Sequence, residues 1–161
     1  MRVVGHGRSV DAPAGWEARI FARAGAAPIL HVATFPLAEH DGDFGAAATA
    51  RMRSGDAFAA LIEYRVDETV RPGHGLFSPS GRPSSLRAIE FRPNQLQVAR
   101  RGQLGCQRFF TDAGRPCCLY SVIQPGRKPP ERLAQELSGV LATFELARGG
   151  QPGASSTGRA R

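Results

Sequence analysis

Residues 102–125 read GQLGCQRFFTDAGRPCCLYSVIQP, and this stretch decides how the rest of the chain can fold. Two apolar runs at 106–111 and 117–123 flank the polar segment 112–115, in which Gly114 can take a positive φ. This pattern predicts a β-hairpin. Both alternating sets of the second run are largely apolar, so its strand should be central, with other elements covering both faces of the sheet.

The hairpin also sets the environment of the three cysteines. Placing Thr111 opposite Pro116 points the adjacent Cys117 and Cys118 to opposite faces, and Cys106 then faces neither of them. We therefore expect no disulfide, but three buried thiols that act as small apolar side chains. This use of cysteine favours a reducing compartment.

The N-terminus has no apolar core of the length that a signal peptide needs, and no window of the sequence approaches 18 apolar residues. We therefore expect a cytoplasmic protein without a membrane span.

The net charge of +7 raises the question of nucleic-acid binding. Residues 148–161 hold three arginines and no acid, so the net charge of the remaining chain is +4, spread along its length. Lys128 is the single lysine, and the excess of arginine with much Ala, Gly and Pro fits a compositional bias. The charge alone therefore does not predict a nucleic-acid partner.

The elements outside the hairpin are predicted from periodicity and turn residues. An Ala-rich short helix is expected at 44–52, with Asp43 near its N-terminus. Residues 67–85 are rich in Pro, Gly and Ser and predict a long loop with Leu76 and Phe77 as an apolar tether. Strands are expected at 2–5, 16–23, 29–35, 57–66 and 86–92, and residues 96–99 lead into the hairpin.

The clearest periodic signal lies near the C-terminus, after Pro129-Pro130-Glu131. Its apolar side chains recur at helical spacing, at Leu133, Leu137, Val140, Leu141 and Phe144. The chain is thus predicted to be one α+β domain over 1–147, a twisted antiparallel sheet of about five to seven strands. The C-terminal amphipathic helix should pack on one face of that sheet, followed by a disordered Gly/Ser/Arg tail at 148–161.

Four segments in order carry a family resemblance: PAGW at 13–16, AALIEYRV at 59–66, the hairpin, and RLAQELSGVLATFEL at 132–146. The order resembles the Mog1/PsbP-like proteins, including small actinobacterial members, over about residues 13–146. The resemblance implies a single domain with a twisted antiparallel sheet between helices. It also implies roles in assembly, binding and protein–protein contacts, and it supplies no shared catalytic residues.

The sequence predicts no catalytic, cofactor-binding or metal-ligating residue. Asp41-Gly42-Asp43 opens like a calcium loop, but Met52 stands where the loop needs an oxygen ligand. The four histidines lack metal-site spacing, no serine lies in a nucleophile elbow, and no base is predicted beside a cysteine. The residues chosen as a candidate surface patch are Arg100, Arg101 and Arg108, the last beside two phenylalanines.

Two functional hypotheses follow. The first is a non-enzymatic interaction or assembly module whose partner is another protein, because the chain offers no catalytic set. The alternative is a small-molecule binder or enzyme with a cleft beside the 67–85 loop, which is long enough to form a lid.

Overall fold

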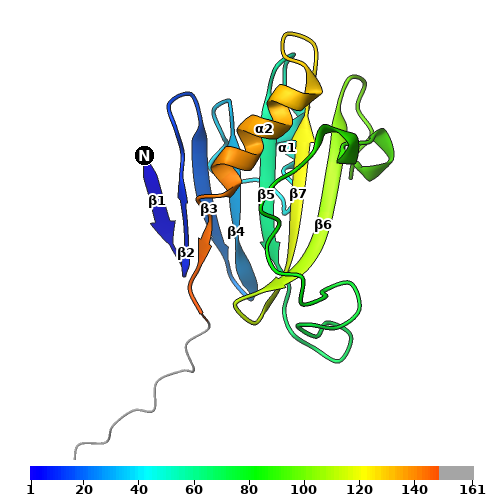
Figure 1. Cartoon of the computed structure of the whole chain (residues 1–161). Coiled ribbons are helices and arrows are strands. Elements are labelled where there is room, and N and C mark those ends of the chain that lie inside the picture. Colours follow the sequence, from blue (N-terminus) through cyan, green and yellow to red (C-terminus); the bar gives the residue numbers. More distant parts are fainter. Residues whose placement is uncertain (149–161) are drawn as a thin grey trace, which may run out of the picture.

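The computed structural model describes residues 1–148 and shows an α+β protein with two antiparallel sheets (Figure 1). The main sheet has five strands in the order β3-β4-β5-β7-β6, and a small second sheet has the order β1-β2-β8. The strands are β1 (Arg2–Gly5), β2 (Arg8–Asp11), β3 (Glu17–Arg23), β4 (Ala26–Ala33), β5 (Ala57–Glu63), β6 (Leu104–Asp112), β7 (Arg115–Ile123) and β8 (Glu145–Leu146). The helices are α1 (Ala46–Ala50) and α2 (Pro130–Leu141), and two short 3-10 turns are η1 (Ala88–Glu90) and η2 (Pro93–Gln95).

The predicted hairpin is present as β6 and β7, and its register is the predicted one, with Thr111 opposite Pro116. Ala113 and Gly114 both have positive φ, 51° and 73°, which makes the connection a type I′ turn that matches the twist of the strands. β7 lies between β5 and β6, and its residues from Pro116 to Ile123 are buried. The expectation of a central strand covered on both faces is confirmed.

α2 lies across one face of the main sheet (Figure 1). Four of the five predicted apolar positions lie in α2 and are buried there, Leu133, Leu137, Val140 and Leu141. The helix ends earlier than predicted, so Phe144 lies after it, but Phe144 is buried in the same core. They pack with alternate side chains of β5 and β7 such as Leu61 and Leu119. The amphipathic helix is therefore confirmed, in both its periodicity and the face it covers.

The opposite face of the sheet carries a second core. Alternate residues of β5 and β7, among them Phe58 and Tyr120, pack there with Ala48 and Met52 from α1 and the residues after it. The main sheet is thus covered on both sides. None of the helices in residues 1–148 has the length and apolar character needed to cross a bilayer.

The short helix is shorter than predicted and begins later. Its amides are capped by Asp41, whose carboxylate accepts hydrogen bonds from the N–H groups of Ala47 (3.0 Å) and Ala48 (2.8 Å). Asp43 forms an ion pair with Arg23 at 2.5 Å. The sequence favoured Asp43 because it lies nearer to the helix, but the left-handed Gly45 turns the chain so that Asp41 reaches the amides.

The strand predicted at 86–92 is wrong. This segment contains η1, and η2 follows it. Leu86 and Phe91, which the alternation placed on opposite faces, both enter the core, whereas Ile89 is 69% exposed. Strands β2 and β8 were not predicted, because each is short and their pairing joins distant parts of the chain. The tail prediction falls, apart from Arg148, outside the described residues.

Gly45 provides a test of this packing. A Cβ at this position would lie 2.2 Å from the Phe58 ring, and the φ of 64° disfavours a side chain. Gly45→Ala should lower the free energy of unfolding by about 2–4 kcal/mol, through overpacking and backbone strain together. Urea denaturation measures the change. Gly42→Ala is the matched control, since a Cβ at Gly42 meets nothing within 4 Å; equal stability of the two variants would contradict this packing.

Candidate interaction site

The outer edge of β6 is covered by the irregular segment 64–103. Every second residue of β6 directs its N–H away from β7, toward this segment. Three of these outer N–H groups are hydrogen-bonded to it: Gly105 to the Arg92 carbonyl (3.0 Å), Gln107 to Gln95 Oε1 (3.1 Å) and Thr111 to the Ser78 carbonyl (3.0 Å). The segment therefore protects an edge that would otherwise be open to pairing with another chain.

Phe109 is the exception in this pattern. Its N–H also points outward, but no residue among 1–148 accepts it. Its ring packs at 5.7 Å from the Phe77 ring and 6.3 Å from the Tyr64 ring, on the opposite face of the sheet from α2. Leu76 and Phe77 were predicted to hold the 67–85 loop against the sheet. Phe77 is buried and does so, whereas Leu76 is exposed.

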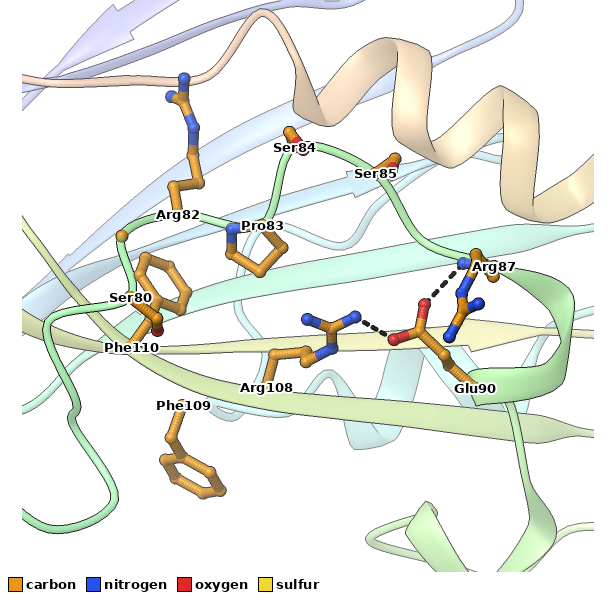
Figure 2. Close-up of a pocket in the computed structure, with 11 residues that line it drawn as sticks. Ser80, Arg82, Pro83, Ser84, Ser85, Arg87, Glu90, Arg108, Phe109 and Phe110 are labelled. Carbon is orange, nitrogen blue, oxygen red and sulfur yellow. Dashed lines mark hydrogen bonds and ion pairs between the residues drawn. The ribbon is translucent and has the colours of Figure 1, made fainter.

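Two adjoining hollows of about 350 and 320 Å³ lie over this edge on the α2 side. They share Arg87, Glu90 and Arg108, while Arg82 lines the first hollow and Arg92 the second. We call the surface formed by these five residues the arginine groove. Figure 2 shows the first hollow, with the Phe109 ring turned away from it, so that Phe109 borders the hollow by its main chain.

Glu90 lies at the centre of the groove. Its Oε1 accepts a hydrogen bond from the Arg108 guanidinium, and its Oε2 accepts the Arg87 N–H at 2.7 Å (Figure 2). Partial burial acts to raise the pKa of Glu90, but the Arg87 N–H and the Arg108 guanidinium together lower it. Glu90 is thus held as a carboxylate between two arginines.

The groove carries an excess of positive charge. Arg82, Arg87 and Arg92 have no ion-pair partner among residues 1–148, and Arg108 shares the single carboxylate of Glu90. Four arginines therefore line a surface that holds one acid, with the Arg87 and Arg108 side chains beside Glu90 and the Arg82 side chain pointing away from it (Figure 2). Arginine binds carboxylate and phosphoryl oxygens through two parallel hydrogen bonds, so this arrangement is suited to an oxyanion.

The predicted patch Arg100, Arg101 and Arg108 does not form one surface. Arg108 lies on the α2 side in the groove, whereas the Arg100 guanidinium donates to the Ala46 carbonyl of α1 at 3.5 Å, on the other side. Arg101 is exposed. Sequence analysis missed the three unpaired groove arginines; their even spacing of five residues around Glu90 was the available signal.

The histidines and acids in the described part of the chain form no group that could hold a metal ion. His31 is fully buried between the rings of Phe21 and Phe58, at 4.9 and 5.0 Å, and its Nε2 lies 3.2 Å from the Asp43 carbonyl oxygen. Burial lowers the pKa of His31, and the positive charge of Arg23 lowers it further. The hydrogen bond to Asp43 and the negative charges of Asp41 and Asp43 act in the opposite direction but do not cancel the effect of burial on this pKa. It packs as a neutral core side chain.

The three cysteines are buried and free, as predicted. Burial raises the pKa of Cys106 to about 11 and those of Cys117 and Cys118 to about 12. Because the thiolate is the reactive form, none of these thiols has the environment of a nucleophile.

Comparison with protein-family models, with characterised proteins and with solved structures gives no match for this chain. The assignment of the arginine groove as the candidate site therefore rests on contacts within the chain.

The state of Cys118 is open to direct measurement. A maleimide should leave the native thiol unmodified and should label all three cysteines in urea, because unfolding removes the burial that raises their pKa values. Cys118→Ser should destabilise the fold by about 1–3 kcal/mol, since its hydroxyl would be poorly satisfied, and Cys118→Ala should cost less. Rapid labelling of Cys118 without unfolding would contradict the structural role.

Proposed function

We propose that the protein is a non-enzymatic interaction module that binds an acidic segment of a partner protein in the arginine groove. The observation that carries the proposal is the charge imbalance there, four arginines to one carboxylate, of which Arg82, Arg87 and Arg92 lack an ion pair in residues 1–148. Such a surface attracts acidic side chains over distances of about 10 Å at 0.1 M salt.

A protein partner fits this surface better than a nucleic acid does. Single-stranded nucleic acids stack their bases on exposed aromatic rings beside the basic residues. The two phenylalanines next to Arg108 do not provide such a platform: Phe110 is buried in the core and the Phe109 ring packs on the opposite face. The exposed apolar side chain at the groove is instead Ile89, which suits a protein contact.

The resemblance to the Mog1/PsbP-like proteins supports the same proposal, because members of that group act in assembly and protein–protein contacts. Membership is itself proposed, on the ground of the antiparallel sheet and the closing helix α2. A cytoplasmic location is proposed from the three free, buried cysteines.

The second candidate function is the binding of a small anionic molecule. The first hollow lies directly beside residues 80–85, its volume of about 350 Å³ is within the range of ligand pockets, and Ser84 and Ser85 line it. This candidate uses the same arginines, so one assay can compare the two.

The test measures binding of a fluorescein-labelled peptide, eight residues of alternating glutamate and alanine, by fluorescence anisotropy. The triple variant Arg82→Gln/Arg87→Gln/Arg92→Gln should bind about tenfold more weakly, as expected for the loss of three charged contacts of ordinary strength. The matched control is Arg53→Gln/Arg101→Gln/Arg127→Gln, which removes the same charge from exposed arginines elsewhere and should bind like the wild type.

Equal loss of binding in both triple variants would contradict the proposal, because the attraction would then come from net charge and not from the groove. Tighter binding of a single-stranded DNA of equal charge would contradict a protein partner. Citrate that binds as tightly as the peptide, with the same dependence on the groove arginines, would favour the second candidate.

A further inference from the structure

We infer that Glu90 occupies the anion-binding position of the arginine groove in the free protein, and that the acidic group of the ligand binds by displacing it from Arg108. This inference rests on the proposed function and names the chemistry of the ligand: an oxyanion on an acidic peptide, either a carboxylate or a phosphoryl group. Glu90 would then set both the affinity and the selectivity of the site.

The contacts of Glu90 are those of a bound anion. Its carboxylate accepts a hydrogen bond from the Arg108 guanidinium and one from a main-chain N–H, that of Arg87. The Arg87 side chain lies on its other side (Figure 2), and the positive charges of Arg108 and Arg87 both lower the pKa of Glu90. An external carboxylate in this position would find the same donors.

The two partners of the ion pair differ in how firmly they are held. Arg108 belongs to β6, whose backbone is fixed by the ladder with β7. Glu90 belongs to η1, a single turn of three residues in which Ile89 is exposed, as is Arg87 directly before the turn. Glu90 can leave Arg108 by a rotation of its own side chain while Leu86 and Phe91 stay packed in the core, whereas Arg108 stays in place to receive the ligand.

Access to the pair is open from the groove. The Arg108 side chain is 40% exposed and the Glu90 side chain 18%, so the guanidinium can be reached by a ligand while Glu90 is still bound. Exchange of one carboxylate for another at Arg108 is nearly neutral in energy by itself. Arg82 and Arg92, which have no ion pair among residues 1–148, gain a partner only with the ligand, and they provide the difference.

Glu90→Gln tests the inference on the full chain. The amide keeps an oxygen that can accept the Arg87 N–H, but it removes the charge that competes for Arg108. The variant should bind the glutamate peptide about three- to tenfold more tightly than the wild type, which corresponds to about 0.7–1.4 kcal/mol. Glu131→Gln is the matched control, because it changes the net charge equally at an exposed position of α2, and it should leave affinity unchanged.

A double-mutant cycle assigns the effect to Arg108. Arg108→Gln should weaken binding, and Glu90→Gln should add nothing in that background. The ¹⁵N signal of Arg108 Nε should move on Glu90→Gln, which removes its carboxylate partner, and should return toward the wild-type position when that variant is saturated with peptide. A second peptide with phosphoserine in place of one glutamate identifies the oxyanion. Tighter binding of the phosphoserine peptide would assign the site to a phosphoryl group, and tighter binding of the glutamate peptide would assign it to a carboxylate.

The outcomes separate this inference from the proposed function. If the groove triple variant loses binding but Glu90→Gln binds no more tightly than Glu131→Gln, the groove is the site and the displacement of Glu90 is overturned. If neither the wild type nor Glu90→Gln binds either peptide, both are overturned. Binding by Glu90→Gln where the wild type shows none would support displacement in its strongest form. Thermal unfolding midpoints near that of the wild type exclude misfolding as the cause.

Discussion

The burial of β7 on both faces is the constraint on which the rest of this structure depends. Its two alternating sets of side chains, represented by Leu119 and Tyr120, enter separate cores above and below the sheet. Each core needs a cover, and the chain provides α2 for one and α1 with its flanking loops for the other. The strand order follows as well, because β7 needs a strand on each side to satisfy its backbone, and β5 and β6 are those strands.

Placing β7 inside the sheet makes β6 an edge strand. Segment 64–103 covers that edge, because Arg92, Gln95 and Ser78 accept hydrogen bonds from the outer N–H groups of β6. The packing of Phe77 against Phe109 holds the same segment on the other face of the sheet. The same segment carries the groove arginines. The candidate site thus arises where a protective cover meets the strand it protects, and Phe109 leaves one backbone donor open there.

The sequence predicted an element correctly where that element depends on residues close together in the chain. The hairpin register depends on the turn residues Ala113 and Gly114, and α2 depends on the spacing of its own apolar residues, so both were predicted correctly. The second sheet was not predictable in this way, since β2 and β8 pair through contacts such as Ser9 with Glu145, which no local pattern encodes.

The candidate site was harder to predict for the same reason. Arg108 was singled out with its sequence neighbours Arg100 and Arg101, but alternation along β6 directs Arg108 to the α2 face. Its actual neighbours come from the segment around η1, which was predicted as a strand from the alternation of residues 86–92. Only the tertiary position of that segment brings Glu90 to Arg108.

Amide hydrogen exchange resolved along β6 tests the central claim most directly, that segment 64–103 covers this edge except at Phe109, whose main chain borders the arginine groove where the ligand binds. In the free protein, the amides of Gly105, Gln107 and Thr111 should exchange slowly, and that of Phe109 should exchange fast. The acidic peptide should slow Phe109 and leave the other three unchanged. Fast exchange at all four positions, or protection by the peptide on a surface away from Phe109, would contradict the account.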